Sequence, residues 1–256
     1  MPRHPDRNVV WHRSRPGAPR YRTSRRPSPR SARYNCSDKP GGVRSYRQGQ
    51  LTRDVVELVR SAGHDSAHVV GHDWGALVAW DLALRNPEVV DRLGVVNVPH
   101  PWVFRRTMLT NLAQFRKSWY VFFFQLPRLP EWSARRDGFR LWVDALRDGS
   151  NPGTFSETDL ERYRRAWNRE RAPTAMINWY RAMVRHRDDP PRDRVAAPTL
   201  VVWGENDQAL IPEMAPRSLD YCDDGRLERF ADATHWIVHE HPDRITDLLV
   251  SHLSRQ

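Results

Sequence analysis

The 256-residue sequence has only two cysteines and no apolar stretch long enough to cross a membrane. Cys36 and Cys222 are far apart and form no CxxC pair, which argues against a disulfide framework and against a zinc site. A transmembrane helix would need a run of about 18 apolar residues, and the N-terminus is too polar for a secretory signal. We therefore expect a cytoplasmic protein with no metal and no membrane partner.

Acidic residues are almost absent from the N-terminal part, which explains the sequence pI of about 10.4. Residues 1–34 contain ten Arg, no Lys and a single acid, Asp6. The remaining residues are nearly neutral, because they hold 31 of the 41 basic and 30 of the 31 acidic side chains. A nucleic-acid or anionic-surface partner would have to bind this one segment. Its sequence predicts no folded basic face, so we expect no nucleic-acid partner.

Residues 1–33 also lack any hydrophobic period, and six prolines interrupt them. Such a composition cannot bury enough apolar surface to fold alone, so this first segment is expected to be disordered. The prolines also argue against the amphipathic helix of a transit peptide.

From residue 34 the pattern changes to short apolar strands that alternate with helices. Residues 34–99 contain predicted helices over 51–63 and 76–87 and predicted strands over 66–71 and 92–98. The alternation resumes in residues 191–256, with strands over 199–203 and 226–230 and a closing helix over 242–253. Alternating strands and helices predict an α/β fold, in which a mostly parallel sheet is flanked by helices.

Between these two parts, residues 100–190 predict an inserted α-helical domain. One helix begins with a capping signature, Ser156 followed by Asp159. We expect the aromatic run Phe122–Phe124 and the tryptophans to form the interior of this domain and a pocket wall. Six of the eleven tryptophans lie here: Trp102, Trp119, Trp132, Trp142, Trp167 and Trp179.

The most informative stretch is VVGHDWGALVAW, residues 69–80, in which two glycines flank a turn between a strand and a helix. Gly-x-nucleophile-x-Gly at such a turn is a nucleophile elbow, and the central residue here is Asp73 in place of serine. A carboxylate can attack a saturated carbon without a base to deprotonate it, giving an ester that a second step must hydrolyse. The alternative is that Asp73 merely caps the helix.

A second acid and a histidine follow in the order that such hydrolases use. Asp207 comes after the strand over 199–203, and His235 lies in the loop after the next strand. His235 would deprotonate water while Asp207 orients the imidazole.

Other polar residues near these positions receive lower rank. His72, which precedes the nucleophile, is interpreted as a structural donor, and Glu205 and Asp232 rank below Asp207 as the acid. Asn97 ends a strand where an acid could also stand, but it carries no charge.

GHDWG, GENDQAL and THW resemble the epoxide hydrolase branch of the α/β-hydrolase superfamily, and YNCSDKP resembles the segment before its nucleophile helix. The resemblance covers residues 34–256. It implies an α/β-hydrolase core with a helical cap, no cofactor, and a small hydrophobic epoxide as the substrate of a monomer or homodimer. It also implies that Tyr120, in SWYVFFFQLP, and Tyr180, in NWYRA, donate hydrogen bonds to the epoxide oxygen. The backbone N–H of Trp74 would contribute to an oxyanion hole.

Related haloalkane and fluoroacetate dehalogenases present Trp and Asn N–H groups to a halide, so Trp74 leaves a dehalogenase as the alternative. A non-catalytic remnant of the fold is a further alternative.

The sequence departs from the family at its N-terminus, where the first strands and an HGFP-type loop are expected. That loop supplies the second oxyanion N–H, and no equivalent is found in this sequence. The N-terminal strands are thus expected to be missing, which would make the strand that leads to Asp73 an exposed edge prone to aggregation. An abrupt change of this kind is what a reading-frame error or a wrong start would produce; the encoding DNA in all three frames tests that hypothesis.

Overall fold

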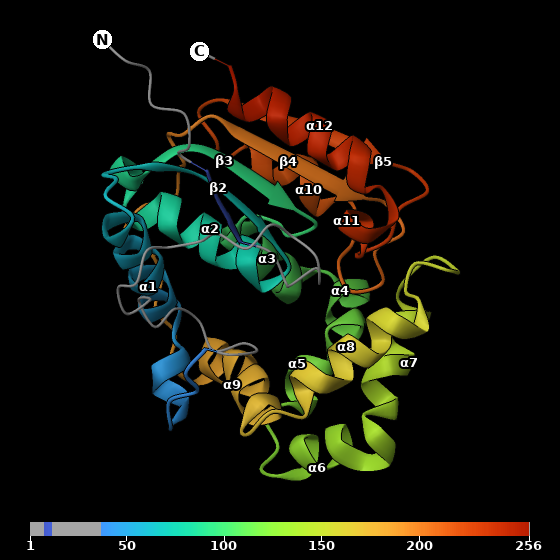
Figure 1. The fold of residues 1–256 in the computed structure, drawn as a ribbon. Coiled ribbons are helices and arrows are strands. Elements are labelled where there is room, and N and C mark those ends of the chain that lie inside the picture. Colours follow the sequence, from blue (N-terminus) through green and yellow to red (C-terminus); the bar gives the residue numbers. More distant parts are fainter. Residues whose placement is uncertain (1–7, 12–36, 256) are drawn as a thin grey trace.

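The computed structural model describes residues 8–11 and 37–255, and Figure 1 shows how they are arranged. Within these residues five parallel strands form one sheet in sequence order: β1 (Asn8–Trp11), β2 (Ala67–His72), β3 (Val90–Val96), β4 (Thr199–Gly204) and β5 (Gly225–Phe230). The last four confirm the strands predicted from the sequence, and the α/β fold is confirmed with them.

Helices cover both faces of the sheet, because alternate residues of each strand point to opposite faces. On one face, Val201 packs in a core that includes α1 (Gln48–Ser61), α2 (Trp74–Arg85) and α10 (Met214–Leu219). On the other face, Leu200 and Val202 pack against α11 (Ile237–Glu240) and α12 (Pro242–Leu253). In Figure 1 the helix α12 lies on the side of the sheet opposite to α2.

The expectation that the strand of Asp73 is an exposed edge is wrong. Residues Asn8–Trp11 form β1, which pairs with β2 in parallel register from Asn8 opposite His68 to Trp11 opposite Gly71. A β-ladder is made by backbone N–H and C=O groups, so four extended residues can cover an edge without a long apolar pattern. The rest of the segment expected to be disordered, residues 1–7 and 12–33, lies outside the described residues.

The segment between β3 and β4 is helical, as predicted, and runs below the sheet in Figure 1. We call it the helical insertion. Its helices are α3 (Pro101–Thr110), α4 (Leu112–Lys117), α5 (Trp119–Phe123), α6 (Leu129–Arg135), α7 (Arg140–Asp148), α8 (Glu157–Trp167) and α9 (Ala172–Arg185). Short 3-10 helices occur at Val43–Tyr46, Pro87–Val89 and Arg136–Gly138. At the start of α8, Ser156 and Asp159 form the predicted capping box.

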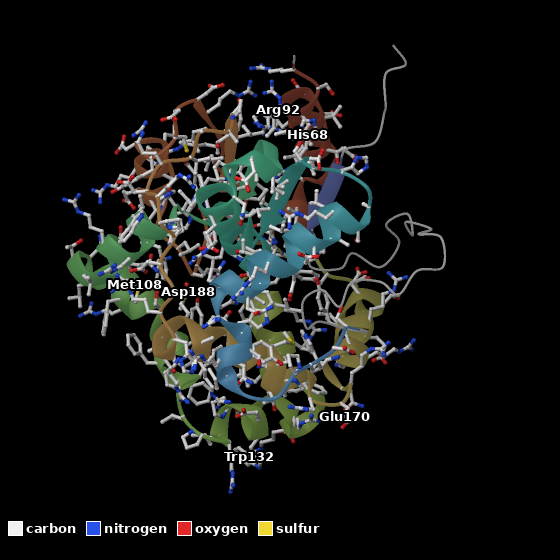
Figure 2. The ribbon with its side chains drawn as sticks, turned by 90° about the vertical axis from the view of Figure 1, so that its left-hand side faces the viewer. His68, Arg92, Met108, Trp132, Glu170 and Asp188 are labelled. Atoms are coloured by element: carbon white, nitrogen blue, oxygen red, sulfur yellow. The ribbon has the colours of Figure 1, made fainter. Side chains whose placement is uncertain are left out.

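Only part of the aromatic set lies in the interior of the insertion. Trp167 is buried in a cluster with Phe139 and Tyr163, and Trp236 of the loop after β5 completes it. By contrast, Trp119, Trp132 and Phe122 are exposed, so the prediction that they fill the core is wrong. The labelled Trp132 points away from the body of the protein in Figure 2. Aromatic content alone does not show which face of a short helix is covered.

A buried ion network joins the insertion to the strand-bearing part. The Asp81 carboxylate in α2 is buried and accepts hydrogen bonds from Thr52 Oγ1 at 2.5 Å and Arg85 Nε at 2.7 Å. The Arg85 Nη2 group also lies 3.1 Å from Oδ1 of Asp188, in the segment that follows α9. Asp188 lies at the boundary of the two parts in Figure 2, and its Oδ2 accepts from the Gly49 N–H of α1. Burial raises the pKa of Asp81, although Thr52 and Arg85 oppose the shift.

Replacing Arg85 by Met should therefore lower the free energy of unfolding by about 3 kcal/mol, because Asp81 would keep its burial but lose its cation. Urea denaturation of the full chain measures this. The matched control is Arg60→Met, which removes an exposed pair with Glu57 and should cost less than about 1 kcal/mol. Equal effects of the two substitutions would show that the network does not stabilise the fold.

Candidate active site

Asp73 stands in a sharp turn between β2 and α2. Its backbone is left-handed, with φ of 54° and ψ of −129°, a conformation that costs free energy for a residue other than glycine. A Cβ added at Gly71 would lie 2.4 Å from the carbonyl oxygen of Gly75, so only glycine allows the strand and helix to pass this closely. Asp73 makes no side-chain capping bond to α2, which contradicts the alternative that it is a simple cap.

The three residues predicted as a catalytic set lie together. His235 Nδ1 is 2.7 Å from Oδ2 of Asp207, and His235 Nε2 is 3.7 Å from Oδ1 of Asp73. The other oxygen of Asp207 accepts from the backbone N–H groups of Ala209 at 2.7 Å and Leu210 at 3.0 Å. The imidazole is thus held between a buried carboxylate and the carboxylate of the elbow, while the roles of these residues remain a prediction.

Asn97 belongs to this site, although the sequence suggested no role for it. It is buried at the end of β3, and its Nδ2 donates to Oδ2 of Asp207 at 3.0 Å and to the Thr234 carbonyl at 2.9 Å. Its Oδ1 accepts from the Gly204 N–H at 2.7 Å. The backbone of Asn97 is left-handed, with φ of 50°, which asparagine tolerates better than most residues. The only signal in the sequence was that an amide side chain stands at the end of a predicted strand.

The residues that the sequence analysis ranked below Asp207 and His235 make other contacts. His72 Nε2 donates to the carbonyl of His235 at 2.7 Å, which confirms that His72 is a structural donor. Glu205 pairs with Arg229, and the exposed Asp232 lies near His241. Asp207 is therefore the acid that contacts His235.

Burial and charge compete at His235. Burial lowers its pKa, but the carboxylates of Asp207 and Asp73 outweigh burial and raise the pKa to about 10. Burial likewise raises the pKa of Asp207, yet the imidazolium and two backbone N–H donors hold it below its ordinary value. The two carboxylates therefore favour the protonated imidazole over the neutral one.

Tyr120 and Tyr180 approach the elbow from the insertion. Their ring centroids are 5.7 Å apart, and the ring of Tyr180 lies 4.8 Å from that of Trp74 in an edge-to-face arrangement. Burial raises the pKa of Tyr120 well above its usual range, and the nearby Tyr180, Asp73 and Asp207 raise it further. This phenol is therefore a protonated donor within electrostatic reach of Asp73.

Polar contacts hold α4, the helix just before that of Tyr120, on the loop of Asp207. Gln114 of α4 donates to the Ala209 carbonyl at 2.8 Å and accepts from the Ile211 N–H at 3.0 Å. Lys117 Nζ donates to the Asp207 carbonyl at 2.8 Å. These bonds fix the insertion relative to the acid of the site.

A similar set of bonds fixes Tyr180 relative to Tyr120. Gln125, which follows α5, donates to the Tyr180 carbonyl at 3.1 Å. Arg181 of α9 is buried and donates to the Phe124 carbonyl at 2.9 Å. The two tyrosines therefore belong to one rigid part of the insertion.

In the family the HGFP-type loop would precede residue 37 of this chain. Apart from β1, that part of the chain lies outside the described residues. Within the described part of the chain, no cluster of three or more His, Cys, Asp or Glu could hold a metal. None of the described helices is long and apolar enough to cross a membrane.

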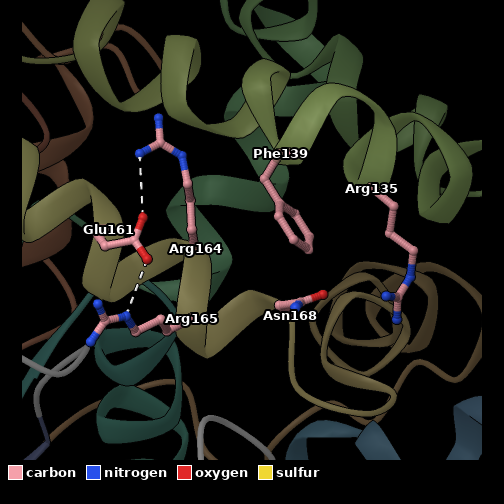
Figure 3. Close-up of a pocket in the computed structure, with 7 residues that line it drawn as sticks. Arg135, Phe139, Glu161, Arg164, Arg165 and Asn168 are labelled. Atoms are coloured by element: carbon pink, nitrogen blue, oxygen red, sulfur yellow. Dashed lines mark hydrogen bonds and ion pairs between the residues drawn. The ribbon is translucent and has the colours of Figure 1, made fainter.

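A separate pocket lies in the insertion (Figure 3). Glu161 lies between the two guanidinium groups of Arg164 and Arg165, at 3.9 and 3.1 Å. The arginines are thus partly neutralised, and none of the predicted catalytic residues lines the pocket. It is lined by Arg135, Gly138, Phe139, Glu161, Arg164, Arg165 and Asn168.

A parallel sheet, an elbow after a central strand and an acid and histidine on later loops define an α/β-hydrolase. The family model for the alpha/beta hydrolase fold matches residues 22–242, so the chain belongs to that family.

Several individual proteins of known name are similar to this chain. The chain is 36% identical over 223 residues to the AB hydrolase superfamily protein YfhM of Bacillus subtilis, covering 87% of this chain and 78% of that protein. It is 34% identical to epoxide hydrolase 1 of Caenorhabditis elegans and 31% identical to human epoxide hydrolase 4, in each case over 87% of this chain. The chain spans only 56% and 63% of the length of these two animal proteins.

Among solved structures, the epoxide hydrolase of Bacillus megaterium in complex with an inhibitor superposes with a TM-score of 0.78 at 28% identity. The match covers 87% of this chain and 81% of that protein.

The environment of His235 predicts a response to loss of the elbow charge. In Asp73→Asn the pKa of His235 should fall from its value of about 10, because one of the two carboxylates that raise it becomes neutral. Nitrogen NMR of the imidazole during a pH titration measures the shift. The ion pair should also stabilise the fold fully below the ordinary histidine pKa of 6.5 and lose this effect as the pH rises through about 10.

Asp232→Asn is the control, since Asp232 lies near His241 and not in the site. If His235 titrates identically in wild type and Asp73→Asn, the carboxylate of Asp73 does not act on it.

Proposed function

We propose that this protein is an epoxide hydrolase that opens a hydrophobic epoxide to a diol through an alkyl ester on Asp73. The observation that carries the proposal is the Asp73 carboxylate in the elbow, 3.7 Å from His235 Nε2, with Tyr120 and Tyr180 approaching from the insertion. The names of the relatives support it. A mutant of a Bacillus megaterium epoxide hydrolase, 27% identical to this chain, has been solved with its naphthyloxy-propanediol product, which supports an aryl-bearing substrate.

In the first step an oxygen of Asp73 attacks an epoxide carbon, and the bond from that carbon to the ring oxygen breaks. The oxygen leaves as an alkoxide and takes a proton from the hydroxyl of Tyr120 or Tyr180. Phenol O–H donors in a buried site stabilise the charge as it develops. The products are a neutral ester on Asp73 and a tyrosinate.

Esterification changes the charge that His235 experiences. Once Asp73 is neutral, one of the carboxylates that raise the pKa of His235 is gone, so the imidazolium becomes a better acid. It can then return a proton to the tyrosinate and become neutral. The first step thereby generates the base that the second step needs.

In the second step neutral His235 removes a proton from water, and the hydroxide attacks the ester carbonyl of Asp73. Asp207 and Asn97 keep the imidazole oriented, while the Trp74 N–H at the start of α2 stabilises the oxyanion. As the tetrahedral intermediate collapses, the ester C–O bond breaks and the leaving alkoxide takes the proton of the new carboxyl group, which releases the diol and restores the Asp73 carboxylate beside a protonated His235. No cofactor is needed for this sequence of steps.

A haloalkane dehalogenase is the alternative, with Trp74 as one N–H donor to the halide. The amide beside the site, Asn97, donates both its N–H groups to Asp207 and Thr234. Two tyrosines near Asp73 suit an alkoxide better than a halide, because an alkoxide must be protonated. A non-catalytic remnant of the fold would bind without forming an ester.

Replacing the nucleophile tests the covalent step. After a pulse of styrene oxide, intact mass spectrometry should show a covalent adduct on wild type and none on Asp73→Asn, because the amide is a far weaker nucleophile. His235→Gln is the positive control: it retains the carboxylate, so it should form the adduct and keep it. An adduct on Asp73→Asn would mean that another residue is the nucleophile.

Removing a tyrosine hydroxyl tests the choice between epoxide and halide. Tyr180→Phe should slow epoxide opening by about 10- to 1000-fold, by analogy with the loss of one oxyanion donor. Tyr163→Phe removes a hydroxyl that lies 3.4 Å from His239 of α11, and it should leave the rate unchanged. Equal losses of Tyr180→Phe on an epoxide and a haloalkane would argue against the role given to Tyr180.

The absence of an HGFP-type loop from the sequence leads to a kinetic prediction. Alkylation forms no tetrahedral intermediate, whereas ester hydrolysis uses both oxyanion donors, and losing one costs about 3–4 kcal/mol in acyl-transfer sites. Capture of styrene oxide should thus be faster than release of diol, so the adduct should decay slowly in a mass-spectrometric time course. Full multiple turnover without an adduct would show that another N–H completes the oxyanion hole.

A further inference from the structure

One face of the segment α4–α5 is apolar and yet exposed. Four side chains spaced three and four residues apart line it, as on one face of a helix. Their exposed fractions are 62% for Leu112, 47% for Phe115, 63% for Trp119 and 47% for Phe122. The rings of Phe115 and Phe122 lie 5.2 Å apart, so these side chains form a continuous surface, which we call the apolar stripe.

The fold does not account for the apolar stripe. The segment is anchored through its other side, where Gln114, Ser118 and Val121 are buried. Backbone bonds from Ser118 N–H to Gln114 O and from Val121 N–H to Ser118 O carry the helical path across the join of α4 and α5. Single exposed apolar residues are common on protein surfaces, but a contiguous row with a tryptophan at its centre marks an interaction surface.

Basic residues flank the apolar stripe in the sequence. Residues 101–130 contain five basic residues and no Asp or Glu. Of these, Arg106, Arg116 and Arg128 are exposed, and no carboxylate of the described residues lies within ion-pair distance of them. The labelled Met108 of α3, close to Arg106 in the chain, lies at the periphery of the insertion in Figure 2.

The apolar stripe and the neighbouring arginines together indicate which kind of partner binds. Aromatic and leucine side chains beside arginines are the composition of helices that lie in the surface of an anionic bilayer. A second copy of the chain would bring equal charges together around the stripe, and the Arg-rich N-terminal segment carries the same sign. Charge complementarity therefore favours an anionic lipid surface over either.

We propose that the apolar stripe binds reversibly to anionic membrane surfaces, with Trp119 and Phe122 entering the interface and Arg106 and Arg116 contacting lipid phosphates. The expectation of no membrane partner rested on the absence of a membrane-spanning run, and peripheral binding requires none.

The apolar stripe is connected to the candidate active site, which gives membrane binding a function in substrate delivery. Ring contacts lead inward from Trp119 to Phe123 at 6.0 Å, to Phe124 at 5.8 Å and to Tyr180 at 4.8 Å. Apolar epoxides concentrate in bilayers, so docking would place the tyrosines next to their source. This delivery role rests on the proposed function, whereas membrane binding itself does not.

Co-sedimentation of the full chain with lipid vesicles tests the proposal. Wild type should bind vesicles of phosphatidylcholine mixed with phosphatidylglycerol, bind phosphatidylcholine alone more weakly, and lose binding at high salt. Trp119→Ser/Phe122→Ser and, separately, Arg106→Glu/Arg116→Glu should each lower the partition coefficient about tenfold or more. Unchanged thermal unfolding of both variants checks that they are folded.

Two controls match these variants away from the stripe. Leu141→Ser/Val250→Ser removes equally exposed apolar side chains, and Arg60→Glu/Arg255→Glu makes the same change in net charge. Both should bind vesicles like wild type. So should Asp73→Asn, which separates this test from that of the proposed reaction.

The proposal is overturned if wild type does not bind anionic vesicles, or if both stripe variants bind as well as wild type. The second result would assign binding to the N-terminal arginines. It is also overturned if Trp119→Ser/Phe122→Ser turns a dimer into a monomer in light scattering without weakening vesicle binding, because the stripe would then be an interface between two copies.

Discussion

The whole site depends on how closely β2 passes the first turn of α2. The strand can turn into the helix at this point only because Gly71 has no side chain to meet the Gly75 carbonyl. The turn between them forces the Asp73 backbone into a left-handed conformation. It places Asp73 just beyond the C-terminal end of β2. Strain of this kind persists only where surrounding structure holds it, here β1 and β3 on either side of β2. A rigid carboxylate is what an in-line attack on a strained ring requires.

Around that turn, one buried carboxylate organises most of the remaining groups. Asp207 receives the imidazole of His235, the amide of Asn97 and two backbone N–H groups, so its charge is compensated within the interior. The same loop accepts Lys117 and bonds to Gln114 of the insertion, which carries Tyr120. The loop that carries Asp207 therefore also anchors α4, the helix that directly precedes the helix of Tyr120.

Local pattern predicted the strands, the elbow and the order of acid and histidine, because each is a feature of a short segment. It did not reveal Asn97, whose importance comes from the approach of β3 to β4 and the loop of Asp207, a contact between residues far apart in the chain. Nor did it predict β1, since four residues carry no detectable period although their backbone can complete a ladder. The exposure of Trp119 and Phe122 was missed because composition does not show which helix faces find a partner.

The central claim is that Asp73 is the group that attacks, so that the diol first receives its new oxygen from the protein. A single turnover of styrene oxide with excess protein in water enriched in heavy oxygen tests this most directly. The account predicts an unlabelled diol and heavy oxygen in the peptide that contains Asp73. Heavy oxygen in the diol of that first turnover, with no label in the peptide, would show that water attacks the epoxide directly and would contradict the account.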